Sequence, residues 1–154
     1  MHSVEQNFAK AEMLIRKPVT AVFNAFIDPA VTTKIWFTKS SGKLEKGKSV
    51  EWTWEMYHHT VPVTVLDIKE EQKIEIEWGN YKDKSTVTWT FTDWGNAATF
   101  VSIINSGFKG DTEQIIAQVR DSTEGFALVL AGLKAYLEYG IQLHLVGDRF
   151  PKGL

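Results

Sequence analysis

One stretch of the sequence matches a nucleotide-binding motif letter for letter. Residues 42–49 read GKLEKGKS, which fits the phosphate-binding loop pattern G-x-x-x-x-G-K-[ST]. That loop binds phosphate where a buried strand leads into it and a helix follows, because the helix N-terminus and the loop amides converge on the phosphate. Here residues 38–41 are polar and residues 50–56 alternate as a strand. We therefore interpret the segment as a turn with solvent-exposed lysines.

The histidines and serines give no pattern of a metal or catalytic site. His58 and His59 are neighbours in a predicted strand, so their side chains point to opposite faces and cannot share a metal ion. The chain has no Cys, which excludes thiolate catalysis and Cys-ligated metals. It also has no G-x-S-x-G nucleophile elbow. We expect no catalytic residue, no metal and no cofactor. His58 stays open as a polar group inside a pocket or as a hydrogen-bonded residue at a strand end.

Four glutamates resemble a carboxylate cluster at first sight. Glu51, Glu55, Glu75 and Glu77 alternate with tryptophans in two predicted strands. Because successive side chains of a strand point to opposite faces, the glutamates lie on the face away from the tryptophans. We interpret them as a solvated outer face with lysine partners.

Composition limits the classes of partner. The 154 residues include 17 Lys and Arg against 19 Asp and Glu, a net charge of −2. Nucleic acid is disfavoured as the main partner, because neutralising phosphates requires a basic surface. The longest apolar stretch, residues 126–133, is far shorter than the roughly 20 residues of a membrane span. Residues 1–10 lack the features of a signal peptide, so we predict a cytoplasmic protein without membrane insertion.

The order of predicted elements is strand, helix pair, several strands and long helix. Pro18 and the Asp28-Pro29 pair are typical starts of two successive helices. Further along, the helical signals predict a helix at 112–120 that breaks or kinks before a second at 122–139. Period-two patterns predict the strands at 9–16, 50–59, 61–68, 74–78, 86–92 and 97–105. Short turns between the strands favour an antiparallel sheet, so the fold class is α+β with the long helix on one face.

The predicted inner face of this sheet carries an unusual number of large rings. The chain has six tryptophans, and four of them fall on the inward side of the strands. This pattern alone leaves two alternatives open. The rings fill a solid core, or they line a cavity between the sheet and the helix in which an apolar ligand binds.

Several motifs resemble those of a known superfamily. They are P-x-x-x-V-F-x-A-F-x-D-P at 18–29, Trp36-Phe37, Ile76-x-Trp78, and residues 122–126 with 133–140 of the long helix. In their order and spacing, the chain resembles the START-like (SRPBCC) superfamily. Within it, the chain is similar to bacterial proteins like the C-terminal domain of the activator of the heat-shock protein 90 ATPase. That family usually has Gly-Trp where this chain has Gly125-Phe126, so one ring is smaller here.

The resemblance implies a helix-grip fold. In it, a curved, mainly antiparallel sheet of about six or seven strands wraps around the C-terminal helix as one domain, 1–154, with a core at about 8–146. It also implies a cavity that takes a hydrophobic small molecule, so we expect a non-enzymatic binder of an aromatic or lipid-like ligand. Alternatives are a modulator of a chaperone ATPase, and a polyketide-cyclase-like enzyme with His58 as general acid or base. The expected ligand-binding residues are Trp36, Trp52, Trp54, Met56, His58, Trp78, Trp89, Phe91, Val101, Ile103, Asn105, Phe126, Val129, Leu130 and Leu133.

Overall fold

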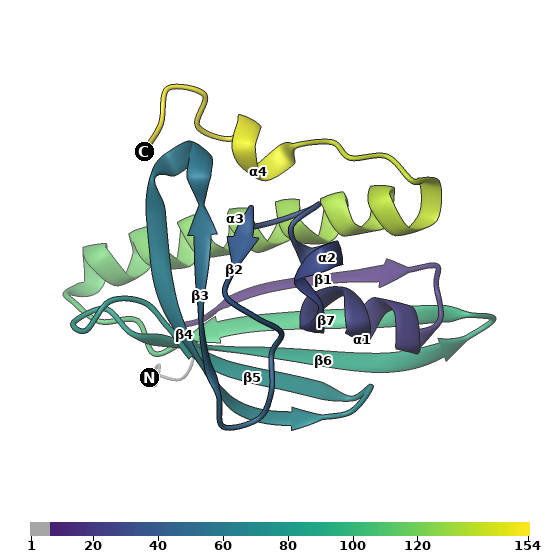
Figure 1. Ribbon diagram of the computed structural model, residues 1–154. Helices are drawn as coiled ribbons and strands as arrows, with labels where there is room; N and C mark the ends of the chain where they lie inside the picture. The colour runs from purple at the N-terminus through teal and green to yellow at the C-terminus, as the bar shows by residue number, and fades with distance from the viewer. Residues whose placement is uncertain (1–6) are drawn as a thin grey trace.

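A seven-stranded antiparallel sheet curves around one long helix in the computed structural model, which describes residues 7–154 (Figure 1). The strand order is β1-β7-β6-β5-β4-β3-β2, and each neighbouring pair is antiparallel. The strands are β1 (Ala9–Ile15), β2 (Lys39–Ser40), β3 (Ser49–Trp54), β4 (His59–Lys69), β5 (Lys73–Trp78), β6 (Ser85–Gly95) and β7 (Ala98–Ser106). The expected α+β helix-grip arrangement is confirmed. The signal-peptide interpretation concerns residues 1–10, most of which lie outside the described residues.

The long helix α3 (Thr112–Tyr139) is continuous, and the predicted break near residue 121 is wrong. It begins with a full capping box, in which Asp111 accepts from the Gln114 amide and Gln114 accepts from the Asp111 amide. In the sequence, Asp121 and Glu124 have the spacing of a second capping box. Within the helix their carboxylates instead pair with Arg149, at 3.0 and 3.1 Å.

Two short helices, α1 (Val19–Ile27) and α2 (Pro29–Thr32), follow the first strand as expected. Asp28 caps α2 by accepting a hydrogen bond from the Ala30 amide at 3.0 Å, and Pro29 occupies the first turn. The chain leaving α2 carries Trp36 and Phe37 into the core, where both are buried.

The hairpin of β3 and β4 differs from the predicted strand at 50–59. The strand β3 ends at Trp54, a short 3-10 helix (Glu55–Tyr57) follows, and His58 takes a left-handed conformation with φ 49°. The period-two alternation therefore stops after Trp54. As a result, Met56 and His58 do not continue the face of Trp52 and Trp54.

The motif at 42–49 is a connection between strands. It joins β2 to β3, and its last residue, Ser49, begins a strand where a phosphate-binding loop has a helix. Gly47 turns with φ 79° and donates its amide to the carbonyl of Val65. The interpretation as a turn is confirmed.

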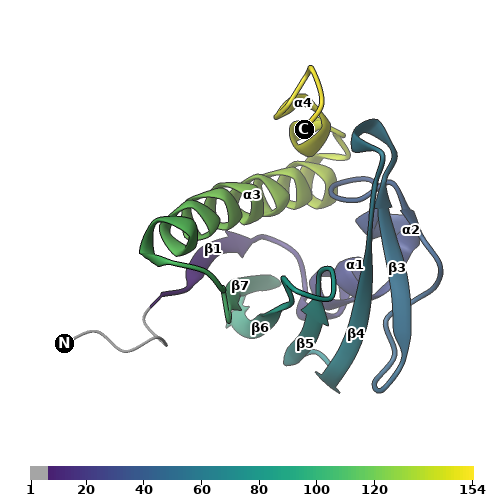
Figure 2. The same ribbon diagram turned by 90° about the vertical axis from the view of Figure 1, so that its left-hand side faces the viewer.

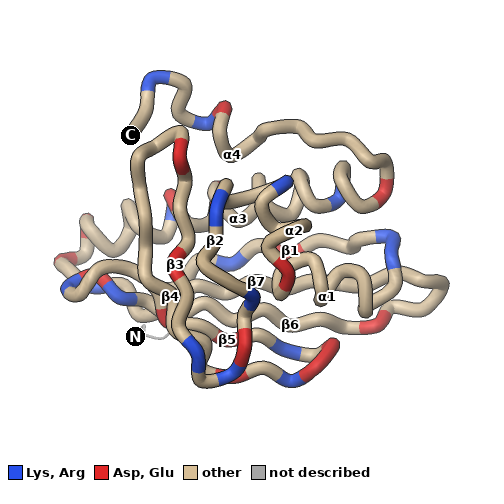
Figure 3. The backbone as a smooth tube through the Cα atoms, in the orientation of Figure 1, with Lys and Arg blue, Asp and Glu red and all other residues tan. Residues whose placement is uncertain are grey.

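The outer face of the sheet carries three of the four glutamates. Glu51 is exposed, Glu75 accepts a hydrogen bond from Thr88 at 3.0 Å, and Glu77 pairs with Lys84 at 3.8 Å. Glu55 is also exposed, but it lies in the 3-10 turn and not on a strand as predicted. Acidic and basic positions are interleaved along the connections from β2 to β3 and from β4 to β5 (Figure 3).

The helix α3 lies on the concave side of the sheet (Figure 2). Beyond it the chain turns back toward the turn of the β3–β4 hairpin and forms α4 (Leu145–Asp148) beside that turn (Figure 1). Among residues 7–154, no helix has the length and hydrophobicity needed to cross a bilayer.

Candidate functional site

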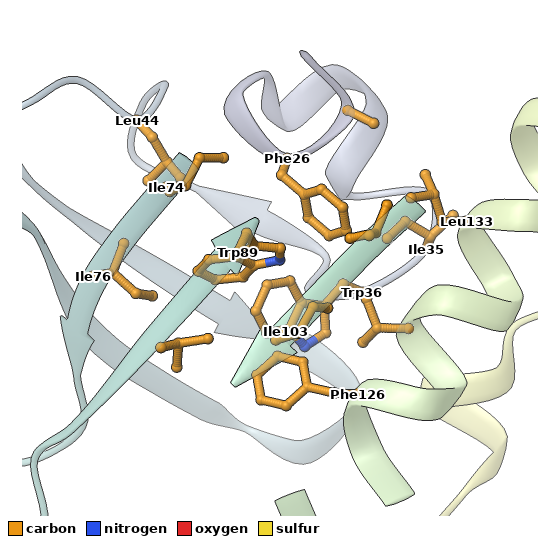
Figure 4. Close-up of a cluster of buried hydrophobic side chains, with 14 of the residues drawn as sticks. Phe26, Ile35, Trp36, Leu44, Ile74, Ile76, Trp89, Ile103, Phe126 and Leu133 are labelled. Carbon is orange, nitrogen blue, oxygen red and sulfur yellow. The ribbon is translucent and has the colours of Figure 1, made fainter. Parts of the chain in front are cut away.

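The middle of the space between sheet and helix is a solid core. Trp89 and Ile103 from the sheet meet Phe126 and Leu133 from α3, and all four are buried (Figure 4). The other predicted lining residues packed in this region are Trp52, Phe91, Val101, Val129 and Leu130. Phe37 stacks on Trp52 with ring centroids 4.6 Å apart, which closes the region further. These residues are brought together as expected, but they pack against one another.

Trp36 lies at the border of this solid core. Its ring is 4.9 Å from Trp52, 5.6 Å from Trp78 and 5.5 Å from Phe126, measured between centroids. The angles between these rings are 59–65°, in the tilted and edge-on range that aromatic pairs prefer. Edge-on packing of several large rings does not fill space on all sides, and the core opens beyond Trp36.

A cavity of about 420 Å³ lies on that side. This volume is within the range of roughly 300–1,000 Å³ that is typical of small-molecule sites. Its walls come from the ends of β3 to β7, the N-terminal half of α3 and the C-terminal segment. The apolar lining residues are Trp36, Trp54, Tyr57, Val61, Trp78, Gly79, Phe108, Gly125, Phe126, Leu128, Val146, Phe150 and Leu154; the polar ones are His59, Asp83, Ser85, Asn105, Gln118, Asp121, Ser122 and Arg149.

Only some of the predicted ligand-binding residues line the cavity. Trp36, Trp54, Trp78, Asn105 and Phe126 line it. The predicted lining residues in the solid core do not.

Met56 and His58 are placed elsewhere, and their predicted position on the inner face is wrong. The 3-10 turn after Trp54 leaves His58 exposed and Met56 40% exposed, with the Met56 methyl directed at α4 near Gly147. The half-buried neighbour His59 lines the cavity instead. An acid–base role of His58 inside the pocket has no support from this position.

A hydrogen-bond network crosses the polar wall. Asn105, 2% exposed, donates from Nδ2 to Ser85 Oγ and to the Thr86 carbonyl, both at 2.9 Å. Its Oδ1 accepts from Ser122 Oγ at 2.8 Å. Trp78 donates from Nε1 to Ser85 Oγ at 3.1 Å. The network therefore joins three strands to α3 along one wall. Among the described residues, Trp89 Nε1 is the buried side-chain polar atom left without a partner.

The C-terminal segment covers the cavity from outside. The Tyr57 hydroxyl donates to the carbonyl of Val146 or Gly147 and accepts from the Phe150 amide at 3.2 Å. Arg149 pairs with two carboxylates of α3 and packs over the Phe150 ring, 4.8 Å from its centroid. Gly125 makes room for this arginine, since a Cβ there would lie 3.3 Å from Arg149 Nη1.

The charges around the cavity are few and mostly paired. Asp83 and Asp121 give two negative charges and Arg149 gives one positive charge, with Arg149 already held by Asp121 and Glu124. Within residues 7–154, no group of three or more His, Asp or Glu side chains is placed to hold a metal ion. The site is thus an aromatic pocket with one hydrogen-bonding wall.

Sequence reasoning missed several cavity residues. Ser85, Ser122 and Arg149 belong to the wall, and Tyr57 and Phe150 close it. The serines carry no periodic signal, and the C-terminal residues lie beyond the last recognisable element. Ser122 and Gly125 were the available signal, because two small residues three positions apart share one face of a helix and indicate a close approach there.

Comparison with known families assigns the chain. Residues 16–138 match the model of the family described as "Activator of Hsp90 ATPase homolog 1-like protein". The chain belongs to this family. The resemblance stated from the motifs is therefore confirmed. No curated protein matches the chain.

Several solved structures share the fold. A protein from Staphylococcus saprophyticus is 28% identical, with a TM-score of 0.75 over 88% of this chain and 95% of that one. The Aha1 dimer of Colwellia psychrerythraea is 15% identical, with a TM-score of 0.73 over 86% of this chain and 97% of that one. An Hsp90 activator from Plasmodium falciparum is 18% identical, with a TM-score of 0.66 over 86% and 96%. The latter two similarities support the fold alone.

Proposed function

We propose that this family member binds a hydrophobic, aromatic or lipid-like small molecule in the cavity beyond Trp36, without catalysis. The observation that carries the proposal is the cavity itself, about 420 Å³ in volume and walled by the rings of Trp36, Trp54, Trp78 and Phe126. At about 25 cal/mol per Å², a ligand burying roughly 300 Å² of apolar surface gains about 7 kcal/mol before ordering costs. We propose that this burial is the main driving force for binding.

Intrinsic tryptophan fluorescence tests the proposal, because three of the six tryptophans line the cavity. The experiment titrates the protein with a panel of hydrophobic aromatic compounds. We expect saturable quenching or a spectral shift with some of them. No change up to the solubility limit of every compound would contradict the proposal. Mass spectrometry of small molecules retained through purification from the native host then identifies the ligand.

The family description favours a second candidate, modulation of a chaperone ATPase. Its support is the match of residues 16–138 to a family described by activation of the Hsp90 ATPase. The test is the ATPase rate of the host's Hsp90-type chaperone with and without saturating protein. A change in rate supports this candidate, and an unchanged rate removes it.

A further inference from the structure

Ser85 has a hydroxyl group that can still donate one hydrogen bond into the cavity. It lies at the start of β6, opposite Trp78 of β5, and lines the cavity. Its Oγ receives two hydrogen bonds, one from Trp78 Nε1 at 3.1 Å and one from Asn105 Nδ2 at 2.9 Å. An indole N–H can only donate, so the direction of the first bond is certain.

The direction of the second bond follows from Thr86. The Asn105 amide nitrogen also lies 2.9 Å from the Thr86 carbonyl, which can only accept. The atom facing Thr86 and Ser85 is therefore the NH₂ group, and Oδ1 is the atom that accepts from Ser122. Ser122 thus uses its own proton within the protein, whereas Ser85 accepts twice.

A hydroxyl has two acceptor lone pairs and one proton. Both lone pairs of Ser85 are taken, and among the described residues no protein atom accepts its proton. Because Ser85 lines the cavity, this proton is available to whatever fills it. The wall consequently offers one oriented donor, fixed by its two neighbours, next to the aromatic rings of Trp36, Trp78 and Phe126.

The charges indicate what kind of acceptor fits. Arg149 is the one Lys or Arg among the lining residues, and it is already paired with Asp121 and Glu124. The lining carries two carboxylates against that single cation. An anionic ligand would lose its hydration without gaining a free counter-charge, whereas a neutral oxygen loses far less on burial and one hydrogen bond offsets that loss.

We propose that the cavity selects neutral aromatic carbonyl compounds, with the Ser85 hydroxyl donating to the carbonyl oxygen while the rings of Trp36, Trp78 and Phe126 contact the ligand's aromatic body. The proposal rests on the proposed function, since it names the ligand class of the same cavity.

Three probes with one naphthalene body test it: 2-acetylnaphthalene, its hydrocarbon isostere 2-isopropylnaphthalene, and the 2-naphthoate anion. Their dissociation constants are measured for the wild type, S85A, S85T and S102A from the indole ¹H–¹⁵N NMR signals. S102A is the matched control, because it removes a half-buried serine hydroxyl from β7 at a position that does not line the cavity. S85T keeps the hydroxyl and tests for rescue, and circular dichroism checks that each variant is folded.

We expect S85A to weaken binding of the ketone about fivefold, the size of one net hydrogen bond, and to leave the hydrocarbon unchanged. S102A leaves the ketone affinity unchanged, and S85T keeps the affinity of the wild type. The infrared carbonyl stretch of bound ketone lies lower in the wild type than in S85A, and naphthoate binds more weakly than the ketone. If both neutral probes bind but S85A affects neither, the selectivity proposal fails while the proposed function stands. If no probe binds, both fail.

Discussion

At the scale of single residues, Glu138 joins the end of α3 to the first strand. Its side chain is 6% exposed and accepts from the Arg16 amide at 2.8 Å and from Lys134 Nζ at 2.7 Å. Lys134 in turn donates to the Leu14 carbonyl at 2.9 Å. Burial raises the pKa of Glu138, but the hydrogen bonds from Arg16 and Lys134 outweigh it and hold the pKa below its ordinary value of 4.5. The charged form is therefore favoured in the folded protein.

This arrangement predicts a loss of stability in E138Q. Hydrogen bonds to charged groups contribute about 1.5–3 kcal/mol, so we expect the free energy of unfolding at pH 7 to fall by about that much. The folded-state pKa is depressed, so the contribution of Glu138 is present above pH 4.5 and is lost as the pH falls below it. Urea unfolding between pH 7 and 3 measures both effects.

The control is E12Q, which changes a carboxylate on the exposed side of β1. It is expected to leave stability nearly unchanged, as surface ion pairs contribute little. The wild type should lose more stability than E138Q on acidification. Equal losses in the two proteins would show that Glu138 does not carry this pH dependence.

At the scale of elements, α3 contains a glycine, Gly132, at a position where the surrounding packing leaves room for a Cβ atom. Gly132 is buried in the helix interior, and a Cβ there would lie 3.7 Å from the Ile35 carbonyl oxygen and 3.8 Å from Ile35 Cβ. These are ordinary contacts, so alanine fits, while a longer side chain meets the backbone at Ile35. We predict that G132A raises the free energy of unfolding by up to about 1 kcal/mol and that G132L lowers it. Thermal unfolding of both variants checks this, and destabilisation by alanine would contradict the contact geometry.

The C-terminal segment is held over the cavity mainly by one tyrosine and one arginine. Removing the Tyr57 hydroxyl in Y57F takes away its bonds to the backbone of α4 and of Phe150. We predict faster amide hydrogen exchange at Phe150 and faster ligand dissociation, with β1 to β7 unaffected. The matched control is Y81F, whose ring is 89% exposed and should have no effect. Unchanged exchange at Phe150 would show that Tyr57 does not hold the segment.

The elements themselves were largely predictable, because their signals are local. Pro18 indicates the start of α1, Asp28-Pro29 indicates the capped start of α2, and the threonine alternation at 86–92 indicates the strand β6. All three elements are present. Two errors share one cause. Both errors came from patterns within a few residues: the alternation through Met56 and His58, and the capping signal at Asp121. Contacts with distant parts of the chain determine the structure at both places. Tyr57 and Arg149 bond to segments far away in the sequence.

At the scale of the whole molecule, the cavity lies at one end of the helix–sheet interface. The inner face was predictable from period two, so Trp52, Trp78 and Trp89 were assigned to the correct side. Periodicity does not indicate where along that face the rings stop filling space. That boundary depends on Trp36, which enters from the connection after α2, and on the C-terminal segment that closes the open end.

The central claim is that a ligand occupies this cavity, and a cavity-filling variant tests it most directly. In V61F the added ring enters the cavity, because Val61 lines it; the matched control is L66F on the outer face of the same strand, where Leu66 is 43% exposed. The measurement is the fluorescence titration of both variants and the wild type with the best-binding compound of the panel. We predict that V61F weakens binding at least tenfold, about 1.4 kcal/mol, and that L66F binds like the wild type. Equal affinity in all three folded proteins would contradict binding in this cavity.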